Sequence, residues 1–446
     1  MRAKELEVTG WGRVPRTTSL AFRPERLAAA AAAVRVRPHG GLVAHGSGRS
    51  YGDAALNDKG HLLLTRRLDR ILAFDPAQAE IVCEPGLTVT ELQSFLGPRG
   101  FTLPAVPGTG FATIGGAVAN DIHGKNHDRH GSIGDHVRWF ELLTADGTFR
   151  RVSPEDDPAL FAATIGGVGL TGILVTVCLG LLTAPSNAVQ VTEMRADNLD
   201  HFLNLLAQYR DRATYSVGWI DVLAQGAKFG RGILEIAEPA PQPVPEKRGR
   251  ALRVPVEMPG FLLNRWSIAA LNCWYYNRIP PLGRERVLPL GKFCHPLDSV
   301  LDWNRMYGRS GFHQFQCVVP DQHAPAGMRR LLEAITESRA ASFLAVLKTM
   351  GGEGKGYLSF PVRGFTLALD FPARPGVREL LQRLEAITLD HGGRIYLAKD
   401  SCLTPDGFAR MYPALPELRK VLARVDPEGV FESDLARRLQ IRGGGR

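Results

Sequence analysis

Two glycine-rich segments, each followed by side chains able to move protons, carry the clearest chemical signal in this 446-residue sequence. The first glycine segment is Ala44-His-Gly-Ser-Gly-Arg-Ser-Tyr-Gly-Asp53, and the second is Pro107-Gly-Thr-Gly-Phe-Ala-Thr-Ile-Gly-Gly116. Glycine lets backbone N–H groups approach a phosphate closely and adopts positive φ without steric cost. Because two such segments lie about 60 residues apart, the sequence predicts a chain that surrounds a pyrophosphate from two sides.

The spacing within these segments excludes two common nucleotide sites. Neither segment continues into the Gly-Lys-Ser/Thr of an ATP-binding P-loop. Neither matches G-x-G-x-x-G with an acidic residue about 20 positions further on, as in simple NAD dehydrogenases. The pattern therefore favours a flavin dinucleotide held by a different fold.

Lys399 is a candidate for the reacting group, although a surface lysine is the more common role for a residue placed just after a strand. It follows a predicted strand beside Asp400, and burial against a flavin would lower its pKa so that it accepts a hydroxyl proton. A lysine that stays charged would instead orient a hydroxyl or a phosphate. Tyr51 and His123 are further catalytic candidates, for polarising the substrate or fixing the flavin. A surface lysine and an ordinary hydrogen-bonded histidine are the structural alternatives.

Metal binding is not predicted. His123 lies close in sequence to Asp121, Lys125, Asn126 and His127, but no second ligand cluster accompanies it. The six cysteines form no CxxC pair, which argues against a zinc site and against a disulfide framework.

Composition places the chain among ordinary globular proteins, with 44% hydrophobic and 22% charged residues. Its net charge of +9 comes from scattered Lys and Arg. This distribution suits a basic surface, an anionic substrate or a membrane surface, and it lacks a nucleic-acid-binding motif. No apolar region of a signal peptide follows Met1, and no apolar run reaches the ~18 residues that span a bilayer. We expect a protein that is cytoplasmic or peripheral at the membrane, with the periplasmic face not excluded.

The expected elements change along the chain. The first part predicts helices at 24–34, 88–96 and 159–164 and strands at 41–45, 61–65, 80–83, 138–144 and 173–179. The second part predicts strands at 312–319, 343–348, 365–371 and 394–398 and helices at 325–339 and 376–390. That order gives two β-α-β-like units, typical of a sheet with helices on one face. The apolar segment 258–276 is either a core helix or a surface that meets lipid or an apolar substrate.

Several motifs together resemble a known family. They include Gly48-Arg-Ser-Tyr-Gly-Asp53, Asp121-Ile-His-Gly-Lys-Asn-His127, Ala398-Lys-Asp-Ser401 and Ser433-Asp-Leu-Ala-Arg-Arg438. The chain resembles the vanillyl-alcohol-oxidase type of FAD-binding oxidoreductases, and within it the branch that oxidises decaprenylphosphoryl-ribose. The likeness extends over nearly the whole chain.

The resemblance implies an α+β fold with a two-part FAD-binding domain of the vanillyl-alcohol-oxidase (PCMH) type. Residues 1–186 and 394–446 would form that domain, and 187–393 would be an inserted antiparallel-sheet substrate (cap) domain. A Pro-rich, charged stretch predicts a mobile loop at about 238–256. Many relatives bind flavin covalently through a histidine of the first glycine segment, but Tyr51 takes that place here. We therefore expect non-covalent FAD.

The resemblance also implies the residues of the site. FAD would lie along Ala44, Gly46, Ser47, Gly48, Arg49, Ser50, Tyr51, Gly52, Asp53, Gly108, Thr113, Ile114, Gly115, Gly116, Asn120, His123, Ile173 and Tyr396. The substrate would contact Trp219, Gln314, Gln316, Lys348, Thr366 and Lys399. Packing within a core or an edge strand is the alternative role for these pocket residues.

The implied reaction oxidises the C2 hydroxyl of a polyprenylphosphoryl-β-D-ribose, with hydride passing to flavin N5. A partner keto-reductase would then complete an epimerisation to arabinose. The alternatives are an oxidase of a soluble sugar, sugar alcohol or aldonolactone, and a flavin-binding protein without turnover. Where that family commonly has Asn and Cys, this chain has Thr366 and Ala368. We therefore expect thiol-directed inhibitors of the family to form no covalent bond here.

Overall fold

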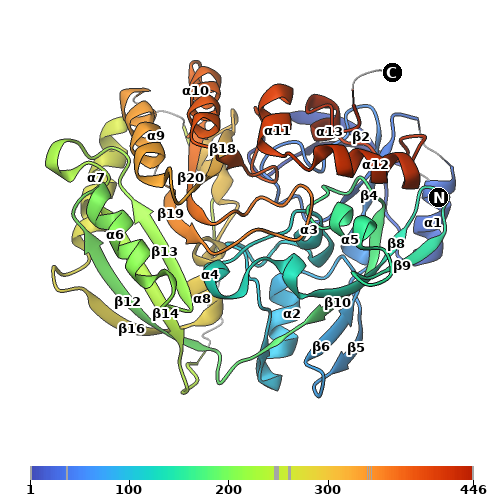
Figure 1. The fold of residues 1–446 in the computed structure, drawn as a ribbon, viewed down its shortest axis with the longest axis horizontal. Coiled ribbons are helices and arrows are strands. Elements are labelled where there is room, and N and C mark those ends of the chain that lie inside the picture. Colours follow the sequence, from blue (N-terminus) through green and yellow to red (C-terminus); the bar gives the residue numbers. More distant parts are fainter. Residues whose placement is uncertain are drawn as a thin grey trace.

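The strands of the first part of the chain form two small sheets (Figure 1). The computed structural model describes residues 3–36, 39–245, 251–259, 263–338, 340, 342 and 344–443. One sheet has the order β1 (Lys4–Thr9), β2 (Arg16–Phe22), β4 (His61–Leu64), β3 (Leu42–His45). The other has the order β5 (Ile71–Asp75), β6 (Glu80–Cys83), β10 (Ile173–Gly180), β8 (Val137–Leu143), β9 (Phe149–Val152). Between their strands lie α1 (Leu27–Arg35), α2 (Val89–Leu96), α3 (Ile114–Ala119), α4 (His127–His130) and α5 (Pro158–Thr164), and β7 (Phe101–Thr102) pairs with β11 (Leu182–Thr183).

The second part builds a large antiparallel sheet. Within the described residues its order is β16 (Arg284–Pro289), β12 (Ala188–Ala196), β14 (Gly232–Pro239), β13 (Tyr215–Ile220), β19 (Ala345–Met350), β20 (Gly364–Pro372), β18 (Phe312–Pro320), β21 (Arg394–Ile395). Its helices are α6 (Leu199–Arg210), α7 (Arg265–Asn277), α8 (Leu290–Cys294), α9 (Ala324–Ser338) and α10 (Val377–Asp390). The units β18-α9-β19 and β20-α10-β21 interleave, so each crossover passes a strand of the other unit, as in ferredoxin-like folds.

One face of the large sheet is covered by helices, as the sequence predicts. Leu347 and Leu367 are fully buried in one apolar cluster with Leu331 of α9 and Leu384 of α10. On β13, a Cβ at Gly218 would lie 2.4 Å from the Phe202 ring of α6. Because side chains alternate between the two faces of a strand, the other face is free to carry polar residues.

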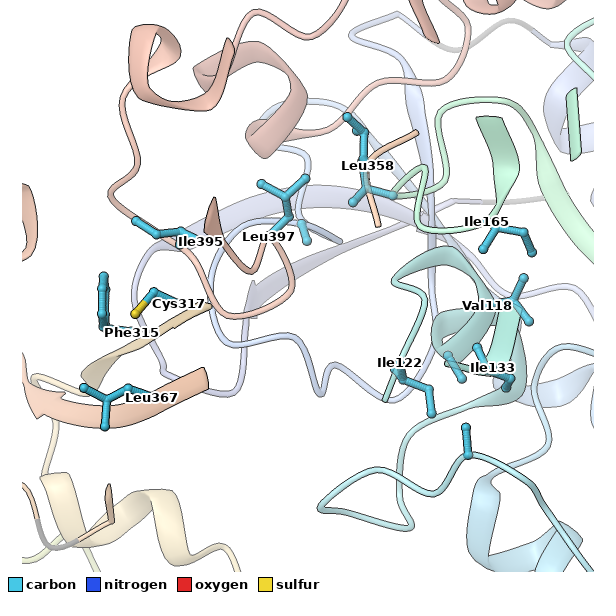
Figure 2. Close-up of a cluster of buried hydrophobic side chains, with 14 of the residues drawn as sticks. Val118, Ile122, Ile133, Ile165, Phe315, Cys317, Leu358, Leu367, Ile395 and Leu397 are labelled. Atoms are coloured by element: carbon cyan, nitrogen blue, oxygen red, sulfur yellow. The ribbon is translucent and has the colours of Figure 1, made fainter. Parts of the chain in front are cut away.

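The same apolar cluster joins the two parts of the chain (Figure 2). It contains Val118 and Ile165 from the first part and Phe315 and Leu367 from the large sheet. One continuous core therefore fixes the position of the large sheet relative to the first part of the chain. No helix within the described ranges has the length and apolar character needed to span a bilayer.

The carboxyl-terminal segment returns to the first part of the chain (Figure 1). Its helices are α11 (Pro405–Met411), α12 (Leu415–Val425) and α13 (Asp434–Arg438). Leu42 N donates to Val430 O at 2.9 Å, and Glu432 N donates to Leu42 O at 3.1 Å. The α+β fold class is thus confirmed, whereas the domain boundaries at 186/187 and 393/394 stay predictions.

Several segments differ from the expected elements or lie partly outside the description. The strand expected at 343–348 corresponds to β19, and residue 343 lies outside the described residues. The strand expected at 394–398 ends at Ile395, because Lys399 N donates to Tyr396 O at 3.0 Å and turns the chain. Of the loop expected at 238–256, residues 246–250 lie outside the described residues. After them, β15 (Leu252–Arg253) pairs in parallel with β17 (Val300–Leu301).

Candidate active site

The two glycine segments are in contact with each other. A Cβ at Gly46 would lie 2.3 Å from Thr113 Oγ1, so only glycine permits this approach. Thr113 is the N-cap of α3, and its Oγ1 accepts a hydrogen bond from Gly116 N at 3.3 Å. The segments predicted to surround one dinucleotide therefore lie side by side.

The first glycine segment also contacts the turn that carries Lys399, residues 396–400, which we call the Lys399 turn. Tyr51 N donates to Ala398 O at 2.9 Å. A Cβ at Gly52 would lie 1.8 Å from Asp400 O. As a result Lys399 Nζ lies 3.9 Å from the centre of the Tyr51 ring. Two catalytic candidates that are 348 positions apart in the numbering are thus adjacent.

Arg438 of α13 connects these same two segments. Its Nε and Nη2 donate to both oxygens of Asp53 at 2.7 and 2.8 Å, and Nη2 also donates to Asp400 Oδ2 at 2.8 Å. Burial raises the pKa of Asp53, and the Arg438 guanidinium counteracts that rise. The Asp53 carboxylate is therefore already paired within the protein, and its predicted role beside FAD remains a prediction.

The register of the large sheet gathers the predicted substrate residues on one face. Thr366 is directly opposite Lys348, and Ala368 is directly opposite Gln316. Trp219 is opposite Val346, two positions from Lys348. Directly opposed residues of antiparallel strands point to the same side. We call this side, the one without α6, α9 and α10, the polar face; Gln314 is also on it, two positions from Gln316.

His123 lies at the junction of the polar face and the first part of the chain. Gln316 Nε2 is 3.1 Å from His123 Nε2, and the His123 ring centre is 5.1 Å from that of Tyr396. Burial and the charge of Lys348 hold the pKa of His123 well below its usual value. The imidazole is therefore neutral. With Gln316 donating to Nε2, the proton belongs on Nδ1, which has no partner within the described structure.

Three buried lysines, Lys125, Lys348 and Lys399, lie around this site. Lys348 Nζ donates to Gly124 O at 2.7 Å, and Lys125 Nζ donates to Phe293 O at 2.6 Å. Burial lowers the pKa of Lys348 to about 7 and that of Lys399 to about 8. Among the described residues, none of these three lysines forms an ion pair with a carboxylate. Asp370 and Asp128 supply part of the countercharge to Lys399 and Lys348, and a bound anion would add to it.

Asp370 is a buried carboxylate on the polar face that the sequence did not single out. It accepts hydrogen bonds from Gln314 Nε2 and from the hydroxyl of Tyr307 at 3.3 Å. Burial raises its pKa to about 7, while the positive charge of Lys399 lowers it. Conversely, the charge of Asp370 raises the pKa of Lys399. The period-2 pattern Thr366, Ala368, Asp370 in the expected strand was the available signal.

Several observations fit a flavin dinucleotide along the glycine segments. Asn120 Oδ1 and Arg49 Nε are buried and have no partner within the described structure. The Arg49 guanidinium lies 4.1 Å from the Trp11 ring centre and 4.8 Å from that of Phe111. A Cβ at Gly108 would meet no atom within 4 Å. Arg49 offers a donor and positive charge for a phosphate, and Gly108 leaves open space. The Asn120 amide oxygen would accept a hydrogen bond from an N–H or O–H group of FAD.

The remaining predicted FAD residues lie around these groups. Tyr396 donates its hydroxyl hydrogen to Asn120 O at 2.9 Å. Ile173 begins β10 and is buried, and Gly48 has a φ of 61°, which favours glycine. Their contacts with FAD stay predictions. Across the described ranges, no group of three His, Cys, Asp or Glu side chains is arranged as a metal site.

Comparison with known proteins agrees with this arrangement. Residues 18–153 match the family described as FAD binding domain, and residues 366–439 match the family described as D-arabinono-1,4-lactone oxidase. The decaprenylphosphoryl-β-D-ribose oxidase of Mycolicibacterium smegmatis is 36% identical over 97% of this chain and 97% of its own. An uncharacterized protein of Streptomyces coelicolor is 36% identical over 80% of this chain and 100% of its own. The L-gulonolactone oxidase of Mus musculus is 27% identical over 37% of this chain and 38% of its own.

Identity over nearly the full length of both chains decides the family, and the FAD-binding match covers both glycine segments. The sequence-based expectation of an FAD-dependent enzyme is therefore confirmed. The chain belongs to the family of the decaprenylphosphoryl-β-D-ribose oxidases, and it is an FAD-dependent oxidoreductase.

Proposed function

We propose that this enzyme oxidises the C2 hydroxyl of a polyprenylphosphoryl-β-D-ribose to the 2-keto sugar. The observation that carries this proposal is the position of Lys399. It lies against Tyr51 of the first glycine segment, and its charge interacts with that of the buried Lys348. A base beside the flavin segment and cations for a phosphate are what this substrate requires. The name of the Mycolicibacterium smegmatis relative supports the same substrate.

Lys399 acts as the base in this proposal. FAD, when bound, supplies the hydride acceptor. Burial disfavours the charged form of Lys399, so that a useful fraction of Nζ is neutral near neutral pH. Lys399 Nζ takes the proton of the C2 hydroxyl as the hydrogen on C2 leaves with its electron pair. The proton on His123 Nδ1 is available for a hydrogen bond to an oxygen of the substrate or cofactor.

Lys348 and Lys125 hold the phosphate of the substrate in this proposal. Each donates to a backbone carbonyl oxygen, which directs its Nζ without neutralising it. Removing charged groups from water is costly unless an opposite charge compensates. A phosphate adds to the partial compensation from Asp128 and Glu235, whereas a neutral sugar or a lactone does not. This difference favours the phosphoryl substrate over the soluble alternatives.

FAD is bound without a covalent link in this proposal. Tyr51 stands where many relatives have the linking histidine. The histidine of the same segment, His45, is buried and its Nδ1 bonds to Ala55 O at 2.9 Å. Acid precipitation is expected to release all flavin into the supernatant. Colour left in the washed pellet would contradict the non-covalent assignment.

An aldonolactone oxidase is the second candidate, since residues 366–439 match the D-arabinono-1,4-lactone oxidase family. Anaerobic bleaching of the oxidised flavin band separates the two. We expect rapid bleaching by a prenylphosphoryl ribose and slow or no bleaching by free pentoses or aldonolactones. Equal or faster bleaching by a lactone would favour the second candidate.

The 2-keto product of the ribose reaction requires a separate keto-reductase to complete the epimerisation, because one flavin site that removes a hydride does not return it from the opposite face.

A further inference from the structure

Helix α7 carries three large apolar side chains on its outer side. Trp266, Leu271 and Trp274 are 79%, 46% and 66% exposed. Ile268, Asn272 and Tyr276, spaced four apart, form the buried side, and Asn272 Nδ2 donates to Asp221 Oδ1 at 2.8 Å. A surface helix of a globular protein normally exposes its polar residues to solvent and buries its apolar ones. Here a polar side chain is inside and two tryptophans are outside.

The region around α7 concentrates both exposed apolar side chains and positive charge. Of eleven large apolar side chains exposed among the described residues, seven lie between residues 252 and 287. Residues 251–294 contain six Lys and Arg but only two Glu. Arg253 pairs with Asp302, and three further arginines of this segment share Glu193 and Glu235. Arg265 of α7 and Lys292 form no ion pair among the described residues, so the segment keeps a positive excess. Exposed tryptophans combined with basic residues are typical of helices that lie at the surface of an anionic membrane.

The same helix contacts the site. The Tyr275 ring of α7 lies 4.8 Å from the Trp219 ring on the polar face. In Figure 1, α7 is at the end of the molecule formed by the large sheet, far from both termini. One side of α7 therefore borders the predicted substrate residues while the other faces outward. A lipid-linked substrate that stays in its bilayer needs such an arrangement.

We infer that α7 docks on the surface of an anionic lipid bilayer, with Trp266 and Trp274 inserted at the headgroup level. This inference rests on the proposed lipid-phosphate substrate and adds where the protein meets the lipid. A second copy of the chain is the competing occupant. It is disfavoured because two copies would bring like charges together across the interface.

Vesicle co-sedimentation of the FAD-loaded protein tests the inference. We expect binding to vesicles of equal phosphatidylglycerol and phosphatidylcholine, weak binding to phosphatidylcholine alone, and weakening by salt. Trp266→Ser/Trp274→Ser should reduce binding by about tenfold or more. The control Leu72→Ser/Phe149→Ser removes side chains of 48% and 46% exposure on β5 and β9 and should bind like the unchanged protein.

Failure of the inference is distinguishable from failure of the proposed function. Flavin reduction by a water-soluble, short-chain prenylphosphoryl ribose should be equal in the unchanged protein and the tryptophan variant. If that reduction is normal but the unchanged protein does not co-sediment with anionic vesicles, the docking inference is wrong. It is also wrong if the tryptophan variant binds vesicles normally. A stable dimer that becomes monomeric only in the tryptophan variant would assign α7 to a second copy instead. Absence of reduction by every prenylphosphoryl ribose would overturn the proposed function itself.

Discussion

The two glycine segments and the polar face of the large sheet reach the same site by different physical routes. The glycine segments meet through backbone, since Gly46 and Gly52 leave no room for a Cβ. The polar face is assembled from side chains of separate strands, held by the register of β18, β19 and β20. The first route depends on residues that are neighbours in sequence. The second depends on pairings that only the folded sheet establishes.

This difference separates two kinds of failure. A substitution at the glycine contacts should lower FAD content and the free energy of unfolding together, because the backbone must move. Damage to the polar face should leave the cofactor in place and alter chemistry, because the sheet is held by its other, apolar face. The following variants break or sharpen that contrast, beginning with the largest expected effect.

Lys399→Ala should abolish substrate-driven reduction while FAD remains bound. Loss of a general base typically costs about 10²–10⁴ in rate. Stopped-flow measurement of anaerobic flavin bleaching gives the rate, and the flavin absorbance gives the cofactor content. Lys420→Ala, which removes an exposed side chain of α12, is the control and should behave like the unchanged protein. An unaltered bleaching rate in Lys399→Ala would remove this lysine from the mechanism.

Gly52→Ala should lower stability and FAD content together. The new Cβ would lie 1.8 Å from Asp400 O, so the first glycine segment and the Lys399 turn must separate. We expect a loss of about 1–3 kcal/mol in the free energy of unfolding. Gly97→Ala is the control, because nothing lies within 4 Å of its Cβ and its φ is −53°. Thermal unfolding and flavin content check both, and normal values for Gly52→Ala would contradict the close contact.

Arg438→Lys keeps a positive charge but loses the paired hydrogen bonds to Asp53 and the bond to Asp400. We expect a loss of about 1–3 kcal/mol in the free energy of unfolding and weaker FAD retention. The neighbouring Arg437→Lys is the matched control, since that side chain is 39% exposed. Denaturant unfolding with flavin present measures the difference. Equal midpoints for the two variants would show that Arg438 does not connect the segments.

Asp370→Asn should shift the pH dependence of flavin reduction without loss of FAD. The reduction rate rises with pH as Lys399 loses its proton, with the pKa of Lys399 at about 8. The negative charge of Asp370 raises that pKa, so its removal lowers the pKa and moves the rising limb to lower pH. Glu379 is an exposed residue of α10, on the opposite side of the sheet. Glu379→Gln should therefore leave the rising limb of the pH profile in place. An unmoved limb in Asp370→Asn would show that the two groups do not interact.

Much of the fold was readable from local patterns. The expected helices at 325–339 and 376–390 correspond to α9 and α10, because apolar residues recur at helical spacing. The strand expected at 365–371 corresponds to β20, because its large apolar residues recur at every second position. The strand expected at 394–398 was too long, since the Lys399 turn is imposed by contact with the first glycine segment. The strand propensity of residues 394–398 contains no information about such a distant contact.

The sequence by itself pointed to an FAD enzyme, because the glycine spacing favoured a flavin dinucleotide and the local motifs around His123 and Lys399 carried the resemblance to a known family. Only the tertiary structure decided that Asp370 faces the site, that Arg438 joins two distant segments, and that Trp266 and Trp274 point outward. A strand's register and a helix's rotation are fixed by what packs against them. Residues far away in the chain supply that packing, and no single segment contains the information.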